Sequence, residues 1–475
     1  MPSAGKIQPK LKIYASLCSG GIMLIPGYLI AASTLLFCCQ ALATNTYILS
    51  QQGIGNRAIG DQSDPTIINN LIMQTQDGEF NNVVAQQSNG NTEGSIIQLQ
   101  RGVSNELMSA QSSSLGSTTS VSQLNVLNKA ETSQTSTLFS TISISQEQSL
   151  NQITSIQNLS TGTTANISQI GTLNFSESIQ DDVALSDVSI SQLGNFNRAE
   201  IIDKESGIAN SASIIQSGSQ NIDTRIILIQ SLGTNNQIQQ FGNNNTARIT
   251  NTNGAFNTNS IVQLTDSSAT SIQTSNSIQG FNSSIQQGQS NRASIIVNLA
   301  QNNQAFTSQS GTNNGSTINQ ININNFSEIT QTGTSNSATS IQLAIEGASS
   351  VVTQSGSDNS ADISQSGSAS EAAIDQELDQ NTLIAIQDGF SARLQLLQQG
   401  LQNQVSSTQS GYIDDADIIQ LGELNTINLT QTGSFNSAEL LQLGTDNFLQ
   451  VIQLSFGATI SISQIGSNNS AIYIQ

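Results

Sequence analysis

Aliphatic and polar residues alternate with a period of two along most of this chain. In the segment Asn425–Gln431, Ile427 and Leu429 fall on one parity, and Thr426 and Thr430 fall on the other. A period of two predicts β-strands that bury one face. Charged residues occupy the opposite parity and are expected to face water, as at Arg57, Arg292, Asp362 and Glu439.

Glutamine follows a second, longer period. In the C-terminal part it recurs at unbroken steps of 11 residues, at Gln354, Gln365, Gln376, Gln387, Gln398, Gln409, Gln420, Gln431, Gln442, Gln453, Gln464 and Gln475. Earlier the steps alternate between 11 and 12, at Gln100, Gln111, Gln123, Gln134, Gln146, Gln157, Gln169, Gln180 and Gln192. The alternation indicates a structural unit of two segments, 22 or 23 residues long, with two unequal turns. About 38 segments follow the first 50 residues, which makes about 19 units.

Glycine and asparagine keep fixed distances from these glutamines, in the order Q-x-G-x-x-N-x-A-x-x-x-Q. Complete copies begin at Gln51, Gln331, Gln354, Gln431 and Gln464. Glycine tolerates the positive φ that a tight turn needs, and asparagine does so better than most residues. We therefore expect each unit to be a flat rung made of a strand, a turn at G-x-x-N, a second strand and a second turn. One two-stranded rung cannot bury its own face, so the rungs must stack.

Stacking in register explains why the same amides recur. A buried amide costs free energy unless its donors and acceptors are used, and neighbours ~4.8 Å apart satisfy one another in a ladder. The predicted ladder residues are Gln51, Asn56, Gln62, Gln331, Asn336, Gln342, Gln354, Asn359, Gln365, Gln431, Asn436, Gln442, Gln464, Asn469 and Gln475. The predicted turn glycines are Gly53, Gly333, Gly356, Gly433 and Gly466. Between Gln216 and Gln342 the steps are irregular, and the spacing predicts ladder positions at Thr252, Ser275 and Asn298.

The predicted fold class is therefore all-β, a cross-β-like β-solenoid of about 19 stacked two-strand rungs over residues 51–475. A disordered Gln/Asn-rich chain is the alternative that composition alone favours. The regular spacing and the aliphatic alternation argue against disorder.

Composition excludes several functional classes. Only 9% of the 475 residues are charged, against roughly 25% in average domains, and the formal net charge is −20. Nucleic acid is not expected as a partner, because phosphate binding needs clustered Lys and Arg. Histidine is absent, which removes catalytic triads and metal sites that depend on imidazole. We expect no catalytic residue, no cofactor and no metal, and therefore no enzyme.

The first 43 residues are typical of an export signal. Lys6, Lys10 and Lys12 accompany an apolar run from Ile13 to Phe37, and Ala41–Ala43 offers a small-x-small cleavage site. A retained membrane anchor is the alternative, because the run is long for a signal peptide. Cleavage would leave a short segment, residues 44–50, before the repeats, and no stable membrane insertion.

The extended pattern S-x5-Q-x-G-x2-N-x-A-x3-Q resembles the curlin repeat, which occurs in the subunits of curli, the functional amyloid of bacterial biofilms. In the segment SEITQTGTSNSATSIQ, Gln331, Gly333, Asn336, Ala338 and Gln342 match this repeat. The resemblance implies a secreted subunit at the bacterial outer surface, which polymerises end to end with copies of itself into extracellular cross-β fibres. Other curlin-like subunits and an outer-membrane secretion apparatus are further implied partners. The chain differs in having many more repeats than an ordinary curlin.

Other functions remain open beside the fibre subunit for biofilm matrix and adhesion. One alternative is a soluble β-solenoid adhesin or surface-binding rod, and another is a fibre nucleator or minor component. A soluble solenoid protects its terminal rungs with polar caps. We find no capping segment around the motif that ends at Gln475, so we expect stacking. The acidic cluster Asp414–Asp417 is interpreted as solvated turn residues rather than a calcium site, because the EF-hand spacing is missing.

Overall fold

The computed structural model describes residues 12–15, 44–343 and 346–475. All regular secondary structure in this part consists of β-strands. It divides into two compact units. Unit 1 ends at Ala209, and unit 2 extends from Asn210 to Gln475. Of the expected signal peptide, only β1 (Lys12–Ala15) is described, and it pairs antiparallel with the strand Thr46–Ile54. The predicted cleavage site lies outside the described residues. No helix in the described part is long and apolar enough to cross a membrane.

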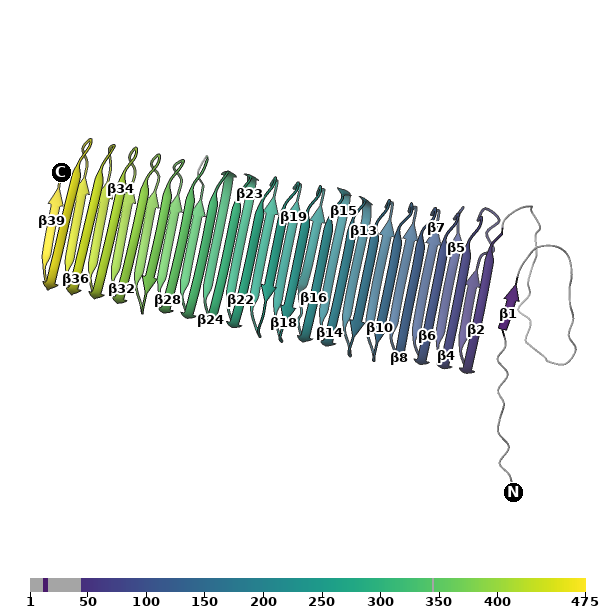
Figure 1. The fold of residues 1–475 in the computed structure, drawn as a ribbon. Helices are drawn as coiled ribbons and strands as arrows, with labels where there is room; N and C mark the ends of the chain where they lie inside the picture. The colour runs from purple at the N-terminus through teal and green to yellow at the C-terminus, as the bar shows by residue number, and fades with distance from the viewer. Residues whose placement is uncertain (1–11, 16–43, 344–345) are drawn as a thin grey trace, which may run out of the picture. The chain divides into compact units, whose positions relative to one another are not determined.

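Unit 1 consists of two parallel sheets whose strands alternate along the chain (Figure 1). In its first sheet lie β2 (Thr46–Ile54), β4 (Leu71–Glu79), β6 (Ser95–Val103), β8 (Thr118–Val126), β10 (Thr141–Glu147), β12 (Thr164–Ile170) and β14 (Asp187–Asn195). In its second sheet lie β3 (Arg57–Asp61), β5 (Asn82–Ser88), β7 (Glu106–Ser112), β9 (Lys129–Thr135), β11 (Gln152–Asn158), β13 (Phe175–Ala184) and β15 (Arg198–Ile208).

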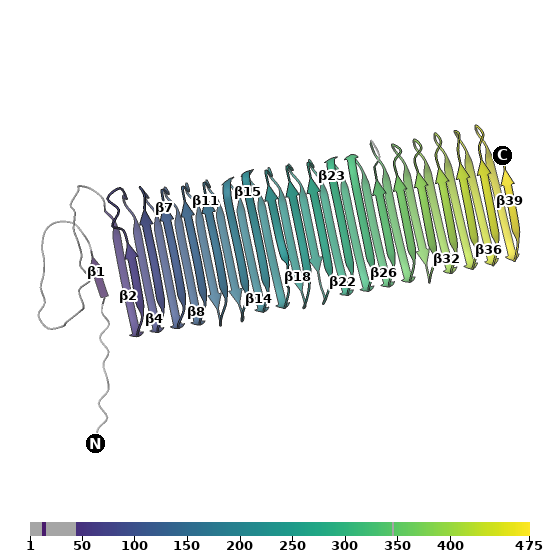
Figure 2. The ribbon, with the colours of Figure 1, turned by 180° about the vertical axis from the view of Figure 1, so that it is seen from behind.

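Unit 2 repeats this arrangement with more strands (Figure 2). In its first sheet lie β16 (Ser211–Ser219), β18 (Asn235–Phe241), β20 (Thr258–Gln263), β22 (Phe281–Gln289), β24 (Gln304–Thr312), β26 (Phe326–Thr334), β28 (Ser349–Ser357), β30 (Glu371–Glu377), β32 (Arg393–Leu401), β34 (Asp415–Glu423), β36 (Ser437–Thr445) and β38 (Thr459–Ser467). In its second sheet lie β17 (Thr224–Ile229), β19 (Thr246–Thr252), β21 (Ala269–Ser275), β23 (Arg292–Gln301), β25 (Gly315–Ile323), β27 (Ser337–Gln342), β29 (Ser360–Gln365), β31 (Thr382–Gln387), β33 (Gln404–Gln409), β35 (Thr426–Gln431), β37 (Phe448–Gln453) and β39 (Ser470–Ile474).

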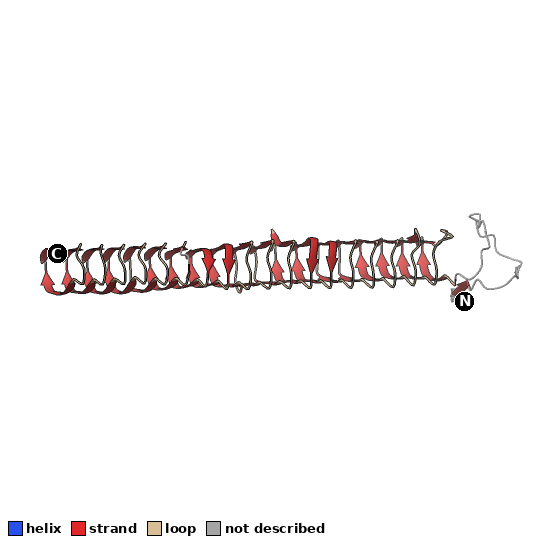
Figure 3. Cartoon of the chain, turned by 90° about the horizontal axis from the view of Figure 1, so that it is seen from above, coloured by secondary structure: helices blue, strands red, loops and turns tan. Residues whose placement is uncertain are grey.

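In each unit a strand pairs in parallel with the strand two places further along the chain. The β26–β28 pair sets Gln331 beside Gln354 and Gly333 beside Gly356, and the next pair sets Gln354 beside Gln376. Figure 3 shows the two layers of strands in each unit. The predicted β-solenoid of stacked two-strand rungs is confirmed, with about 19 turns in total and a repeat of about 23 residues.

The core of each unit lies between its two sheets and is narrow. Inward-facing aliphatic side chains fill it, and Ile318, Ile329, Val352 and Ile363 are each at most 1% exposed. Beside them lie the inward-facing glutamines and asparagines. Buried amides must find hydrogen-bond partners within the protein, so the polar half of the core demands a more precise geometry than the aliphatic half.

The turns differ from the sequence prediction in one respect. The motif asparagines were expected to help form the turn by adopting positive φ, but Asn336 and Asn359 do not adopt it. The residue before each of them does, with φ 57° at both Ser335 and Asp358. The asparagine side chain instead points into the core, where Asn336 is 1% exposed. Asparagine is therefore favoured at this position because its side-chain amide is buried and hydrogen-bonded, and not because its backbone tolerates a positive φ.

The irregular stretch of the second sheet also corrects a prediction. The spacing predicted ladder positions at Thr252, Ser275 and Asn298, but these three residues face outward. Their neighbours Asn251, Thr274 and Val297 are buried and pair in register with one another and with Gln320. A one-residue shift reverses the face of a strand residue, so counting from distant glutamines failed where the turns change length.

Candidate assembly site

The candidate site is a set of ladders of identical side chains. The longest is in the first sheet of unit 2, where Nε2 of each glutamine donates to Oε1 of the next at 2.7–3.0 Å. Its members are Gln216, Gln240, Gln263, Gln286, Gln309, Gln331, Gln354, Gln376, Gln398, Gln420, Gln442 and Gln464. Every bond has the same direction along the chain, so the ladder is polar.

Each ladder glutamine also ties the two sheets together. Besides its bond to Gln376, Gln354 donates from Nε2 to the carbonyl oxygen of Ser337 on β27 at 2.9 Å, and its Oε1 accepts from Gln331 at 2.8 Å. Both donors and the acceptor of the amide are therefore used. Because the carbonyl of Ser337 lies across the core, the glutamine fixes the sheet-to-sheet distance as well as the spacing of rungs.

Three further glutamine ladders have the same geometry. Unit 1 has one in each sheet, running from Gln51 to Gln192 and from Gln62 to Gln180. In unit 2 the second sheet has one from Gln320 to Gln453. That sheet has no glutamine ladder over the four preceding rungs, where Leu228, Asn251, Thr274 and Val297 occupy the inward position.

The motif asparagine forms a second kind of ladder, which fastens the turns. Asn336 Oδ1 accepts the backbone N–H of Asn359 at 3.1 Å, and Asn336 Nδ2 donates to the carbonyl oxygens of Thr332 and Gly356 at 3.1 and 2.9 Å. The asparagine therefore bonds to its own turn and to the turn of the next rung. This explains why glycine and asparagine recur together, because the glycine carbonyl is the acceptor for the asparagine amide.

The motif glycine is required by both conformation and space. Gly333 has φ 114°, a region that other residues rarely adopt. A Cβ on Gly333 would also overlap the carbonyl oxygen of Gly356 on the next rung. The same two conditions hold where Gly53 stacks on Gly78 and Gly444 stacks on Gly466. Close stacking of the turns therefore favours glycine at this position, although Leu378 and Asn125 occupy it in two other rungs with φ 69° and 76°.

The structure distributes the predicted residues over distinct columns. The first-sheet ladders include Gln51, Gln331, Gln354, Gln442 and Gln464, and Gln62, Gln342, Gln365, Gln431 and Gln475 belong to the second sheets or lie directly after their strands. The turns that follow the first sheets contain Asn56, Asn336, Asn359 and Asn469. The predicted turn glycines Gly53, Gly333, Gly356 and Gly466 are instead the penultimate residues of the strands that lead into these turns. Asn436 and Gly433 lie in a turn that follows the second sheet. The two kinds of turn therefore carry separate columns, which the shared motif does not reveal.

Burial varies along these columns. Most of the predicted ladder residues are at most 1% exposed, whereas Gln51, Asn56, Gln62 and Asn469 are half-buried. The side chain of Gln475 is exposed, and its Oε1 accepts a hydrogen bond from the hydroxyl of Tyr473 at 2.9 Å. Most ladder bonds therefore lie in the interior, away from water that would compete for the amides, and those of Gln51 and Gln62 are only partly buried.

Asp414 departs from the solvated role expected for the acidic cluster. It is fully buried in the asparagine column that contains Asn436, and its carboxylate accepts from the backbone and side-chain amides of Asn436, both at 3.1 Å. The backbone N–H of Gly411 also donates to it, at 3.0 Å. Burial raises the pKa of Asp414, and these hydrogen bonds oppose the rise. The other acids of the cluster, Asp415 and Asp417, remain partly exposed.

An exposed aromatic column lies outside the ladders. In successive turns of unit 2, the ring centroids of Phe390 and Tyr412 are 4.9 Å apart, those of Tyr412 and Phe435 are 5.8 Å apart, and those of Phe435 and Phe456 are 5.2 Å apart. The four side chains are 44–77% exposed. Phe390 and Tyr412 are stacked, whereas the other two pairs meet edge to face, so contacts between rings of successive rungs order this column.

The ladders are suited to templating. Within the described residues no cluster of three His, Cys, Asp or Glu side chains that could hold a metal ion is present. What each rung presents to its neighbour is a row of strand N–H and C=O groups and a fixed set of amide donors and acceptors. An open rung of this kind pairs with any strand that offers the same pattern in the same register.

Comparison with known proteins agrees with this geometry. The family model of the curlin associated repeat matches three segments, residues 323–367, 351–377 and 422–454. These segments include the ladder glutamines Gln331, Gln354 and Gln442. No curated protein matches the chain. The chain therefore carries curlin associated repeats in the C-terminal part of unit 2.

Proposed function

We propose that this curlin-repeat protein is a secreted structural subunit whose copies stack end to end into extracellular cross-β fibres of a bacterial biofilm. The observation that carries the proposal is the polar, unbroken glutamine ladder in the first sheet of unit 2. A rung of a second copy offers the same amides at the same spacing, so it can continue both the ladders and the backbone hydrogen bonding.

The direction of the ladders favours head-to-tail stacking. Glutamine amides donate toward higher residue numbers, as Gln331 does to Gln354, and asparagine oxygens accept from higher residue numbers, as Asn336 does from Asn359. Two copies stacked with opposed polarity would place like groups against each other in both columns, donor against donor in one column and acceptor against acceptor in the other. We therefore propose a polar homopolymer at the cell surface, with a structural rather than an enzymatic role.

Further parts of the proposal concern the setting of the protein. Export with cleavage of the leader, passage through an outer-membrane secretion apparatus and co-assembly with other curlin-like subunits all follow from the curlin resemblance. A role as fibre nucleator or minor component would use the same ladders, and is distinguished by whether fibres elongate from this protein alone.

Seeded assembly tests the proposal. Purified protein is diluted from denaturant, and thioflavin fluorescence is followed with and without fragmented seeds, together with fibre diffraction of the product. We expect a lag phase that seeds abolish and reflections at ~4.7 and ~10 Å. A stable monomeric β-solenoid that ignores seeds would contradict the proposal and favour a soluble adhesin or surface-binding rod.

A further inference from the structure

Charge is unevenly distributed within unit 2. Residues 210–327 contain three arginines and two aspartates, a formal charge of +1. Residues 328–475 contain one arginine and fifteen acidic residues, a formal charge of −14. The chain as a whole has a net charge of −20, so the first stretch is an exception. The first stretch of one copy would therefore not be repelled by the acidic second stretch of another copy, and its arginines would be attracted to it.

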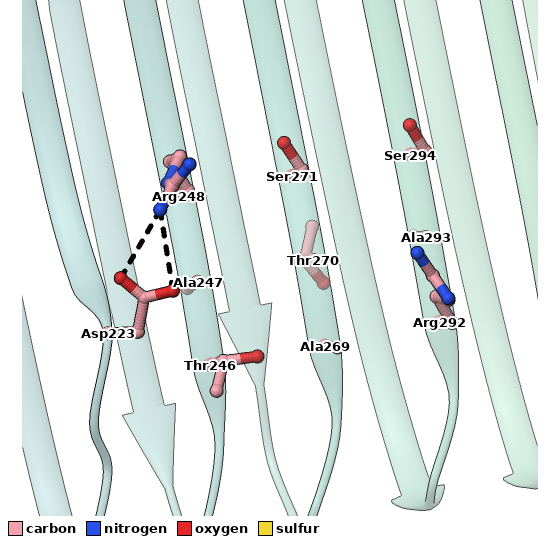
Figure 4. Close-up of a pocket in the computed structure, with 10 residues that line it drawn as sticks. All are labelled: Asp223, Thr246, Ala247, Arg248, Ala269, Thr270, Ser271, Arg292, Ala293 and Ser294. Atoms are coloured by element: carbon pink, nitrogen blue, oxygen red, sulfur yellow. Dashed lines mark hydrogen bonds and ion pairs between the residues drawn. The ribbon is translucent and has the colours of Figure 1, made fainter.

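The stretch of residues 210–327 includes a surface on which two arginines flank small side chains. Arg248 on β19 and Arg292 on β23 project from the outer side of the second sheet, and Ala269 and Ser271 on β21 lie between them (Figure 4). The small side chains leave a shallow hollow of about 330 Å³. We call this surface, Arg248 and Arg292 with the β21 residues between them, the arginine face.

Both guanidinium groups are accessible. Arg248 contacts both carboxylate oxygens of Asp223 at 3.4 Å, and the two side chains are 48% and 56% exposed. Arg292 is exposed and has no ion pair within the described residues. Exposed ion pairs contribute little to stability, so Arg248 can exchange Asp223 for another carboxylate. The arginine face therefore offers two cations to an approaching anionic surface.

The acidic stretch contains a groove on the outer side of the first sheet. Its volume is about 580 Å³, and its floor is formed by outward-facing aliphatic residues of β32, β34 and β36, namely Leu397, Ile419 and Leu441. Asp375 and Glu439 line it as well. Ile419 is 39% exposed, so the floor is open to solvent. We call this surface the acid-rimmed groove.

The acidic side chains of this stretch far outnumber its cations. The one arginine of this stretch, Arg393, is already bonded to Asp415 at 2.8 Å and to Asp417 at 3.4 Å. Asp375 and Glu439 have no ion pair among the residues that the structure describes. Desolvation, together with the charge of Glu377, raises the pKa of Asp375. A cation that entered the groove would favour the charged form of Asp375 and so oppose that shift.

We propose that the arginine face of one copy docks against the acid-rimmed groove of a second copy, which joins filaments side by side with a stagger. An arginine suits this groove because its aliphatic stem can lie on Leu397, Ile419 and Leu441 while its guanidinium reaches a carboxylate. Both surfaces are outer sheet faces, and sheets pack face to face about 10 Å apart. The small residues of the arginine face permit that approach. This lateral contact goes beyond the proposed end-to-end stacking.

Paired substitutions on each surface test the contact. Fibres are grown from seeds of the same variant and imaged by electron microscopy, and the fraction of bundled filaments is measured. We expect R248Q/R292Q to lose bundling while its elongation rate stays unchanged, and D375N/E439Q to do the same. The matched control is R101Q in unit 1, which removes an exposed arginine paired with Asp77 at 3.6 Å and should bundle normally.

A charge exchange makes the test specific. R248E/R292E and D375K/E439K should each fail to bundle alone, because each meets its own like charge, and an equal mixture of the two filaments should bundle again. Bundling of wild-type filaments should also disappear in about 1 M NaCl, where the screening length is about 3 Å. Persistent bundling by R248Q/R292Q, or no recovery in the mixture, would overturn the proposal.

Two other outcomes are informative. If no variant forms filaments, end-to-end stacking fails, and the lateral contact is then measured on the soluble protein by sedimentation velocity. Salt-sensitive dimers that R248Q/R292Q lacks would support the contact, and their absence from the wild type would overturn it. If R248Q/R292Q bundles normally but no longer retains alginate, a carboxylated polysaccharide, the arginine face binds a foreign polyanion and the proposal is wrong.

Discussion

Single positions in the turns are determined by contacts between rungs more than by local preferences. Gly333 is needed because its φ is 114° and because the carbonyl of Gly356 occupies the place of a Cβ. Asn336 is needed because its amide bonds to that same carbonyl. Ser335, which directly precedes Asn336, takes the left-handed conformation, and in other rungs Asp358 and Phe435 do so. The residue type at this left-handed position therefore varies between rungs, whereas Gly333 and Asn336 are each fixed by a contact with the next rung.

The substitution Gly333→Ala should be strongly destabilising. We expect a loss of about 1–3 kcal/mol from the strained φ alone, and more because the next rung must move. The matched control is Gly315→Ala, because Gly315 has no atom near the place of a Cβ and lacks a positive φ. Urea denaturation measures both variants. Equal stability of the two would contradict the role of turn stacking.

Asp414 predicts a pH dependence with a definite sign. Its pKa is raised in the folded state, so its contribution to stability is present below the unfolded pKa of about 3.9 and is lost as the pH rises through the folded pKa. Asp414→Asn restores an amide that can donate to turn carbonyls, as Asn336 does. We expect the variant to be about 1 kcal/mol more stable at pH 7 and the difference to shrink toward pH 3.5.

Thermal or urea denaturation at several pH values measures this difference. Asp362→Asn serves as the control, because Asp362 is exposed on the outer side of β29. Its effect should be small and much less dependent on pH. A wild-type protein that is more stable than Asp414→Asn at pH 7 would show that the buried carboxylate is well accommodated.

The strand is the scale at which the ladders become cooperative. A single side-chain amide bond contributes about 0.5–1.5 kcal/mol, but a ladder glutamine makes one bond along the stack, accepts another and makes a third across the core. An out-of-register strand would lose all of them together. The aliphatic residues alone would tolerate a slip of two residues, so the amides specify the register.

Removal of one ladder glutamine should therefore cost more than one hydrogen bond. For Gln354→Ala we expect a loss of about 2–4 kcal/mol, from the cavity and from the unpaired groups on Gln331 and Gln376. Gln395→Ala is the matched control, because Gln395 is exposed on the outer side of β32. Urea denaturation and seeded elongation both report the difference. A loss of similar size in both variants would mean that a ladder glutamine contributes no more to the free energy of unfolding than an exposed glutamine does.

At the scale of the whole molecule, the proposed stacking of copies through their ladders is opposed by a net charge of −20 on each copy. Exposed acids on parallel stacks repel one another, and salt screens that repulsion. Raising NaCl from about 10 mM to about 150 mM shortens the screening length from about 30 to about 8 Å. We expect a shorter lag phase at the higher salt in thioflavin assays. The lateral contact should weaken under the same change, so a lag phase that lengthens with salt would contradict this division of roles.

The sequence by itself determined the fold class and the period, because alternation fixes which face of a strand is buried and equal spacing forces equal side chains to stack. Ladder positions such as Gln331, Gln354 and Gly356 follow from that spacing alone. Only the tertiary structure decided what depends on neighbouring rungs. It showed that Asn251 rather than Thr252 faces the core, that Asp414 is buried in an asparagine column, and that Asn336 bonds to the next turn. These features depend on turn length and on contacts between residues 20 or more positions apart, which a local pattern does not encode.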